Sequence, residues 1–353
     1  MSTRKTTWKQ AVYMTLATVM GASAVSSATA EAQGLKHKQE ALPQVNYQPG
    51  VLPKEWFTGG PGCATFTQDF QIHKYNDNFY ILRESGCVHA EKPFLYVLFG
   101  NNKAVLFDTG AGSNTDPTTG RDPNVVGAVD QVINEWLARN NRQSLPLVVT
   151  HLHSHFDHIF GDPQFANRPN TTLVPCCSVD ALKAFFGIKN WPHDTAAFDL
   201  GQRTIDIIPI PGHDDTSIAA YDRQTGVLMT GDTLYPGRIY INDPNPKVFA
   251  SSIQRLVDFT STRLVAHVLG THIEQRAPYY DYPIGTHYAP DEIPLQLGRA
   301  HLLELLEATK LRSRSDEGDK KDESRRQITQ KAYRDFTICG PYPQCNPVNA
   351  PPR

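Results

Sequence analysis

The sequence lacks the marks of several common classes of protein. It has no G-x-S-x-G motif, so catalysis by a nucleophilic serine has no support. None of its six cysteines forms a C-x2-C pair, which argues against a cysteine-ligated zinc site. Basic residues are not in excess, because 34 Lys and Arg stand against 36 Asp and Glu. The formal net charge of -2 therefore offers no basic footprint for a nucleic acid, and we expect no such partner.

The first thirty residues differ from the rest of the chain. Three basic residues precede the uncharged run AVYMTLATVMGASAVSSATA, which ends in small residues that suit a cleavage site. This pattern is typical of a secretory signal peptide, residues 1–30, and predicts a periplasmic or secreted protein. A membrane anchor is the alternative, but Ser, Thr and Gly dilute the run and no basic stop-transfer cluster follows. We therefore expect no membrane association after cleavage, when 31 basic residues would face the 36 acidic ones.

The cysteines of an exported chain would mature where disulfides persist. Cys63 with Cys87, and Cys339 with Cys345, are close enough in the sequence to be plausible pairs, and the remaining two cysteines are directly adjacent. Spacing alone does not choose among the pairings. Structural thiols or disulfides are favoured over a role in metal binding.

The rest of the chain divides into three parts by composition. Residues 31–62 are polar and contain several prolines, which predicts an extended N-terminal arm. Residues 63–312 carry the periodic apolar patterns of a folded domain. Residues 313–353 open with the run SRSDEGDKKDESRRQ, whose mixed charges can bury almost nothing, so a solvated linker is expected. A tail with Cys and Pro follows it and could fold back if its cysteines pair.

Short runs rich in Val, Ile, Phe and Tyr predict strands within the folded domain. The first four, FQIHKY, NFYILRE, PFLYVLFG and KAVLFDTG, suggest a mostly antiparallel sheet. Val125–Arg139 has apolar residues at helical spacing, and LPLVVT then reads as a buried strand. The second half repeats this theme with the strands TIDIIPIPG, SIAAYD, GVLMTGD and LVAHVLG and a helix over Ser251–Thr260. Two strand-and-helix halves are therefore expected to face each other, with a further helix over roughly Leu295–Leu311.

The run THLHSHFDHIFG holds four histidines and one aspartate inside eight positions, directly after LPLVV. Alternate side chains of an extended segment share a face, so His153 and His155 can point at one ion. Asp157 and His158 follow as the chain turns. Pairing His151 with His153 would instead require an aspartate at position 155, so His151 is expected to be the spare. Neutral imidazole and carboxylate suit zinc and other borderline divalent metals.

Together with its distant partners, this run resembles the metallo-β-lactamase superfamily of hydrolases, from about Phe70 to about Leu311. Motifs of that superfamily occur in the expected order: VLFDTG with Asp108, HSHFDH, IPIPGH with His213, LMTGD with Asp232, and VLGTH with His272. The resemblance implies an α/β (α+β) fold, a four-layer αββα sandwich, with residues 63–312 as the catalytic domain. It also implies a site for two zinc ions, with iron or manganese as alternatives.

The resemblance further assigns the ligands of the two ions. Those of the first ion are His153, His155 and His213, and those of the second are Asp157, His158 and His272. Asp232 would bridge the ions, and Asp108 would orient the ligand loop without binding metal. His267, which also lies in the last predicted strand, is the alternative to His272 as the final ligand.

Two metal ions about 3.5 to 4 Å apart can share a water and lower its pKa toward about 7, so that a bridging hydroxide attacks without a side-chain nucleophile. We therefore expect an exported binuclear zinc metallo-hydrolase that cleaves an ester, thioester or lactone as its small-molecule substrate. Asp157 can also steer the proton toward the leaving group. Tyr235 and Tyr240, which follow the bridging aspartate, are candidate oxyanion or substrate donors.

The alternatives are β-lactamase activity, an iron-dependent oxidoreductase of the same superfamily and a non-catalytic metal-binding protein. Zinc β-lactamases commonly have Cys or Ser where this chain has Asp232, which favours esters and lactones over β-lactams. The run PGHDDTS replaces the PGHTPGS usual in the glyoxalase II branch, placing Asp214 and Asp215 near the metals, and Phe160 stands where many relatives have glycine. The segment Thr271–Leu295, rich in Tyr and Pro, is expected to lie over the pocket mouth.

Overall fold

The computed structural model describes residues 47–113, 121–241, 246–277, 280–318, 331–332 and 335–340. All of them belong to one unit, Gln44–Arg353. The predicted signal peptide, residues 1–30, lies outside the described residues, as do the first part of the predicted arm and most of the predicted linker and tail. No helix within the described ranges is long and apolar enough to cross a membrane.

The first sheet has six strands in the order β1-β2-β3-β4-β5-β6. They are β1 (Phe70–Asn76), β2 (Phe79–Glu84), β3 (Phe94–Phe99), β4 (Ala104–Phe107), β5 (Leu147–Thr150) and β6 (Thr171–Leu173). The first four pair antiparallel, as the sequence predicted, whereas β4, β5 and β6 are parallel neighbours. Parallel pairing needs a crossover, and α1 (Val125–Arg139) supplies the one between β4 and β5. Its bounds are those that the apolar spacing predicted.

The second sheet has five strands in the order β12-β10-β9-β8-β7. They are β7 (Ala196–Asp199), β8 (Thr204–Pro209), β9 (Ile218–Asp222), β10 (Val227–Gly231) and β12 (His267–Gly270). Only β10 and β12 pair in parallel here, and α5 (Pro246–Phe259) lies between them in the chain. The sequence placed this helix at Ser251–Thr260. It begins earlier because a proline is well tolerated in the first turn.

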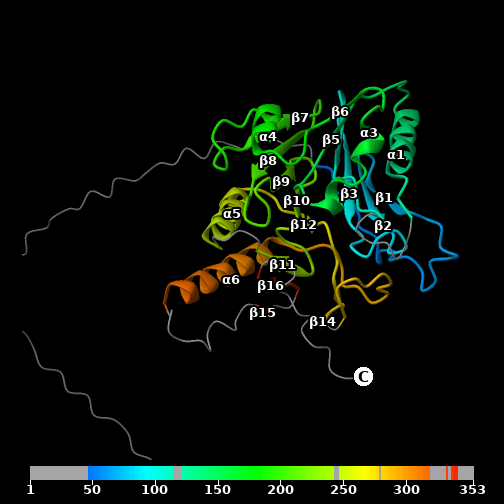
Figure 1. Ribbon diagram of the computed structural model, residues 1–353. Coiled ribbons are helices and arrows are strands. Elements are labelled where there is room, and N and C mark those ends of the chain that lie inside the picture. The colour runs from blue at the N-terminus through cyan, green and yellow to red at the C-terminus, as the bar shows by residue number, and fades with distance from the viewer. Residues whose placement is uncertain are drawn as a thin grey trace, which may run out of the picture. The chain divides into compact units, whose positions relative to one another are not determined.

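The two sheets pack face to face with helices outside both, which makes the four-layer αββα sandwich that was predicted (Figure 1). Side chains from both inner faces, such as Ile81 and Ile207, form the central apolar cluster. A second cluster joins the outer face of the first sheet to α1, and a third joins the second sheet to α5 and α6 (Arg299–Gly318).

Shorter elements connect these layers. They are α2 (Phe156–Ile159), α3 (Asp162–Phe165), α4 (Val179–Phe186), η1 (Thr260–Thr262), β11 (Arg238–Tyr240), β13 (Gln275–Arg276), β14 (Tyr280–Asp281), β15 (Lys331–Ala332) and β16 (Thr337–Cys339). The sequence analysis missed α4, whose first residue follows a side-chain cap: Ser178 Oγ accepts a hydrogen bond from Ala181 N at 3.3 Å.

The C-terminal part of the fold differs from the prediction at two places. The last helix starts at Arg299, not Leu295, because Leu297 is in an extended segment that exchanges backbone hydrogen bonds of 2.8 and 2.9 Å with Val268. The same helix continues past residue 313 into the predicted linker, since that run has no helix breaker before Gly318, where the helix ends. The described part of the tail folds back, because β16 pairs in parallel with β11. The cysteine pairing on which the expectation depended stays a prediction.

Disulfides fix two loops of the described chain. The predicted pair Cys63–Cys87 is confirmed, and the adjacent Cys176 and Cys177 are also bonded. Cys339 is disulfide-bonded, but Cys345 lies outside the described residues, so that pairing stays a prediction. The described part of the arm packs onto the first sheet: Val51 N donates to Tyr75 O at 2.9 Å.

Candidate metal centre

Each predicted motif follows the carboxyl end of a strand. The strands β4 and β5 are parallel neighbours, as are β10 and β12, so each pair presents its carboxyl ends at one edge. Strand β8 points the same way as β10, because both run antiparallel to β9. Ile218 N donates to Leu152 O at 2.8 Å and links the two sheets at this edge. Motifs far apart in the sequence therefore meet in one place.

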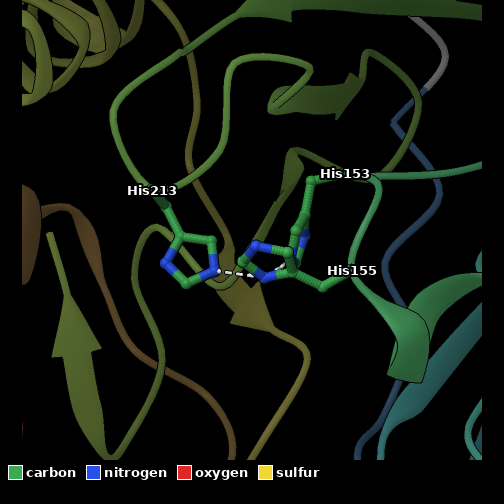
Figure 2. Close-up of side chains that lie close together, drawn as sticks. All are labelled: His153, His155 and His213. Atoms are coloured by element: carbon green, nitrogen blue, oxygen red, sulfur yellow. Dashed lines mark hydrogen bonds between the residues drawn. The ribbon is translucent and has the colours of Figure 1, made fainter. Parts of the chain in front are cut away.

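Three histidines form the first group of candidate ligands (Figure 2). The Nδ1 atom of His155 lies 2.9 Å from His153 Nε2 and 3.1 Å from His213 Nε2. Burial lowers the pKa of both His153 and His213, and neighbouring imidazoles lower it further. A neutral imidazole has one N–H and one nitrogen with a free lone pair. Three imidazole rings whose nitrogens converge can therefore bind one metal cation.

Two carboxylates and two imidazoles, all buried, form the second group: Asp157, His158, Asp232 and His272. The Nε2 atom of His272 lies 3.1 Å from Asp157 Oδ2 and 3.2 Å from Asp232 Oδ1. Burial opposes charge on His158 and His272, but the surrounding aspartates raise the pKa of both rings well above the usual value. The negative charges of Asp157 and Asp232 therefore stabilise a positive charge in the second group. Protonated imidazoles or a metal ion can provide that charge.

The carboxylate of Asp232 lies between the two groups. Its Oδ1 atom is 3.3 Å from His158 Nε2, on the side of the second group. Its Oδ2 atom is 3.8 Å from His153 Nε2 and 3.6 Å from His213 Nε2, on the side of the first. One side chain therefore directs a separate oxygen at each ligand group.

Several imidazoles are held by acceptors behind them. The Nδ1 atom of His158 lies 2.9 Å from Asp108 Oδ2, and the other oxygen of Asp108 accepts from Leu152 N at 2.7 Å. Backbone carbonyls serve the same purpose elsewhere: His213 Nδ1 is 2.9 Å from Tyr240 O, and His272 Nδ1 is 2.9 Å from Glu91 O. A proton on each of these outer nitrogens leaves the inner nitrogen with a free lone pair.

Asp108 itself has a left-handed backbone, with φ of 67°. Aspartate tolerates this conformation better than most residues. The turn directly after β4 brings its carboxylate back over the start of the ligand loop. The orienting part that the resemblance assigned to Asp108 agrees with these contacts.

The two histidines considered as alternatives lie outside both groups. His151 Nε2 is 2.8 Å from Asp162 Oδ1, on the other side of the ligand loop. His267 begins β12 and sets its ring edge against Tyr75, with centroids 6.2 Å apart. His272 follows the end of that strand and joins the second group, as the sequence analysis preferred.

The contacts of Tyr235 do not support its predicted donor role, whereas the role of the Tyr240 hydroxyl stays a prediction. The Tyr235 hydroxyl donates to the backbone carbonyl of Arg238 and also lies 3.1 Å from Glu274 Oε2, while its ring packs on His272 with centroids 5.4 Å apart. Burial, and then Glu274, raise the pKa of Tyr235. The single hydroxyl proton of Tyr235 is therefore used in the hydrogen bond to Arg238 and is not available to an oxyanion. Tyr240 contributes its backbone carbonyl to His213.

Asp214, Asp215 and Phe160 are the residues at which the sequence departs from the glyoxalase II branch or from other relatives. Asp214 lies beside the first group, with Oδ2 3.7 Å from His155 Nε2, and accepts from Ser154 Oγ at 3.1 Å. Asp215 is exposed. Phe160 covers Gly112, where an added Cβ would approach its ring to 2.1 Å.

The predicted cover, Thr271–Leu295, is anchored to the first sheet where it is described. Lys92 Nζ donates to Thr286 O at 2.6 Å, and Arg83 forms a buried ion pair of 2.9 Å with Glu292. The sequence analysis missed the partner of His272, Glu91, because a backbone carbonyl carries no side-chain signature.

Comparison with known proteins places the chain in a family. It is 22% identical over 238 residues to the acyl-coenzyme A thioesterase MBLAC2 of Bos taurus, covering 58% of this chain and 81% of that protein. A hydroxyacylglutathione hydrolase of Francisella tularensis is 30% identical over 102 residues, 29% of this chain and 38% of that protein.

Solved structures include a metallo-beta-lactamase from Pontibacter korlensis, 17% identical with a TM-score of 0.42, covering 68% of this chain and 99% of that one. Another is a metallo beta lactamase from Hirschia baltica, 14% identical with a TM-score of 0.44, covering 69% and 98%. The family model of the metallo-beta-lactamase superfamily matches residues 93–270, about half of the chain. This range contains the motifs of Asp108, His153 to His158, His213 and Asp232, and it ends two residues before His272. The chain therefore belongs to the metallo-beta-lactamase superfamily.

Proposed function

We propose that this chain is an exported, binuclear zinc hydrolase that cleaves an ester, thioester or lactone. The observation that carries the proposal is the position of Asp232, whose two oxygens face two different groups of ligand atoms. A carboxylate shared in this way suits a pair of ions held a few ångströms apart. Histidines and an aspartate on either side complete the two sets.

The residues of the centre fit zinc in chemistry and in burial. Imidazole nitrogens and carboxylate oxygens are ligands that zinc takes, in sets of three or four. Within the described chain, His158 Nε2, His272 Nε2 and Asp232 Oδ1 are buried without a partner of hydrogen-bonding geometry. Buried polar atoms of this kind are costly unless a partner such as a cation satisfies them. When bound, the ions would polarise the substrate carbonyl and lower the pKa of a water molecule.

In this proposal the side chains of the centre have different roles. His153, His155 and His213 hold one ion, and the second ion is held by Asp157, His158 and His272. Burial opposes ionisation of Asp157, but His158 and His272 lower its pKa overall. Asp157 therefore stays a proton acceptor, and we expect it to steer a proton toward the leaving group.

The substrate class rests on the named relatives and on Asp232. An acyl-coenzyme A thioesterase and a hydroxyacylglutathione hydrolase both release an acyl group to water, which supports acyl hydrolysis for this chain. An aspartate at position 232, where zinc β-lactamases commonly have Cys or Ser, favours esters, thioesters and lactones over β-lactams.

Export is the remaining part of the proposal. The N-terminal pattern supports it, and so do the disulfides, which persist in oxidising compartments. N-terminal sequencing of protein from the native compartment should find a mature chain that starts near Glu31 or Gln33. An uncleaved N-terminus with free thiols would contradict export.

The test of the hydrolase is Asp232→Ala, compared with the wild type for metal content, circular dichroism and turnover of chromogenic esters, thioesters, lactones and cephalosporins. We expect fewer than two ions per chain and a loss of turnover of roughly a thousandfold or more, with the fold retained. Full metal content and near-normal activity would mean that Asp232 only makes a turn. A wild type that prefers cephalosporins to esters would overturn the substrate class, and a metal-loaded chain without turnover would indicate a binding protein.

A further inference from the structure

A cleft of about 620 Å³ lies beside the loop that carries His213. Three stretches far apart in the sequence line it: the start of α4 with the loop after it, residues on either side of His213, and residues of α5 between Lys247 and Arg255. A space of this size matches the sites that hold small molecules.

One wall of the cleft is a stripe of α5. Lys247, Ser251 and Arg255 are four residues apart, so they lie on one face of the helix. At 1.5 Å per residue, the two cations are roughly 12 Å apart along the helix axis. The start of α4 and the loop after it add Val179, Trp191, Pro192 and His193 to the lining. An occupant thus meets the guanidinium group of Arg255 and the indole ring of Trp191.

Arg255 is the charge that the fold leaves available. Its Nη1 atom donates to Pro209 O at 2.9 Å, and no carboxylate of the described residues lies within ion-pair distance. Burial lowers the pKa of Arg255, which is half-buried. The acidic residue of the lining is Asp215, which is exposed. A partly buried guanidinium with N–H groups to spare is suited to a phosphate or carboxylate.

The cleft is separated from the first ligand group by one loop. Pro211 and Asp215, on either side of His213, both line it. The loop is held against α5, because Ser252 Oγ donates to Pro211 O at 2.7 Å. Gly212, with φ of 133°, allows this close approach, since an added Cβ would be 2.6 Å from the Phe249 Cα.

We propose that this cleft binds the leaving-group part of the substrate, which carries a phosphate or carboxylate. The anionic group pairs with Arg255, and the uncharged part of the leaving group packs on Trp191. This inference rests on the proposed hydrolase function, because hydrolysis supplies the leaving group. Two kinds of thiol share the required chemistry: one with phosphates, such as coenzyme A, and one with carboxylates, such as glutathione.

Binding of thioether probes to the full metal-loaded chain tests the proposal, because thioethers are not hydrolysed and lack a thiolate that could bind metal. The probes are S-methyl-coenzyme A and S-methylglutathione, each with a counterpart that lacks the anionic groups, S-methylpantetheine or the diamide of S-methylglutathione. Calorimetry should show that one anionic probe binds about tenfold or more tightly than its counterpart. Which probe does so identifies the phosphate or the carboxylate source.

Substitutions at Arg255 and Asp215 should change the affinity for the anionic probe in opposite directions. Arg255→Gln should weaken binding of the preferred anionic probe about tenfold, Arg255→Lys should keep most of it, and Asp215→Asn should tighten it a few fold. Lys310→Gln, on the exposed side of α6, is the control and should change nothing.

The proposal is overturned if neither anionic probe binds more tightly than its counterpart. It is equally overturned if a folded Arg255→Gln protein, checked by thermal melting, keeps the wild-type preference. Because these measurements do not depend on turnover, loss of the hydrolase proposal and loss of this one are distinguishable.

Discussion

His151 and His153 have almost the same burial, 4% and 2% exposed, yet only His153 faces the candidate centre. The difference comes from their neighbours, because Asp162 holds the His151 ring outside the ligand groups. Burial alone therefore does not identify a ligand at the scale of a single residue. The position of the ring nitrogens relative to other ligand atoms does.

The register of the ligand loop can be tested by three single substitutions. We expect His153→Ala and His155→Ala each to lose bound metal and activity, because each removes one of three converging nitrogens. His151→Ala should keep most of both and lose about 1 kcal/mol of stability with its contact to Asp162. Metal content and hydrolysis rates measure the outcome, and equal metal loss in all three variants would contradict the register.

Lys92, which belongs to neither group of candidate ligands, provides a test of how stability depends on pH. Burial lowers its pKa from 10.5 to about 8. Between these pH values the unfolded chain binds more protons than the folded one, so the free energy of unfolding should rise with pH, by at most about 3 kcal/mol. Lys92→Met should remove this rise, whereas the exposed Lys310→Met should retain it. Urea unfolding from about pH 7.5 to 10 measures the slopes, and equal slopes in the two variants would contradict the buried charge.

At the scale of elements, the C-terminal tail contributes to the core. Strand β16 lies against β11, whose last residue supplies the carbonyl behind His213. Phe336, which precedes β16, is 0% exposed and belongs to the cluster under α5 and α6. The tail is therefore part of the domain that carries the centre, although the sequence between it and α6 is highly charged.

Phe336→Ala should lower the free energy of unfolding by about 3–5 kcal/mol, because it leaves a cavity in a packed cluster. Leu303→Ala is the matched control, since Leu303 lies on α6 and is 41% exposed, and it should cost less than about 1 kcal/mol. Urea unfolding of both variants gives the comparison. A small and equal effect would mean that the tail does not pack on the domain in solution.

At the scale of the whole molecule, the centre joins the two halves of the sandwich. His153, His155, Asp157 and His158 follow a strand of the first sheet, whereas His213, Asp232 and His272 follow strands of the second. A metal bound by both sets would hold the sheets together in addition to the central apolar cluster. Metal binding and global stability are then linked.

Removal of metal by a chelator should therefore lower the melting temperature of the wild type by several degrees, and zinc should restore it. A ligand present at about 1,000 times its Kd stabilises a protein by about 4 kcal/mol. Scanning calorimetry of the Asp232→Ala variant should show a smaller shift, because loss of the shared carboxylate weakens the binding of both ions. A melting temperature that is the same with and without metal would contradict a centre shared by the two sheets.

Sequence alone predicted the fold class, the exact span of α1, the pair Cys63–Cys87 and the residues that gather at the centre. The span of α1 follows from local periodicity, which is written in consecutive residues. The fold class and the residues of the centre were implied by the resemblance of the motifs at strand ends to those of the superfamily. The spacing of His153, His155 and Asp157 also separated His151 from its neighbours. Residues with such local signatures could be identified without knowing how the chain packs.

The tertiary structure decided the features that depend on contacts between distant segments. Asp232 directs one oxygen to each ligand group only because parallel and antiparallel strands bring five chain segments to one edge. The carbonyls of Glu91 and Tyr240 hold two imidazoles, and a backbone acceptor has no side chain to recognise in a sequence. The hydroxyl of Tyr235 is committed to Arg238 for the same reason: its partner is chosen by packing, which acts between residues in space and not along the chain.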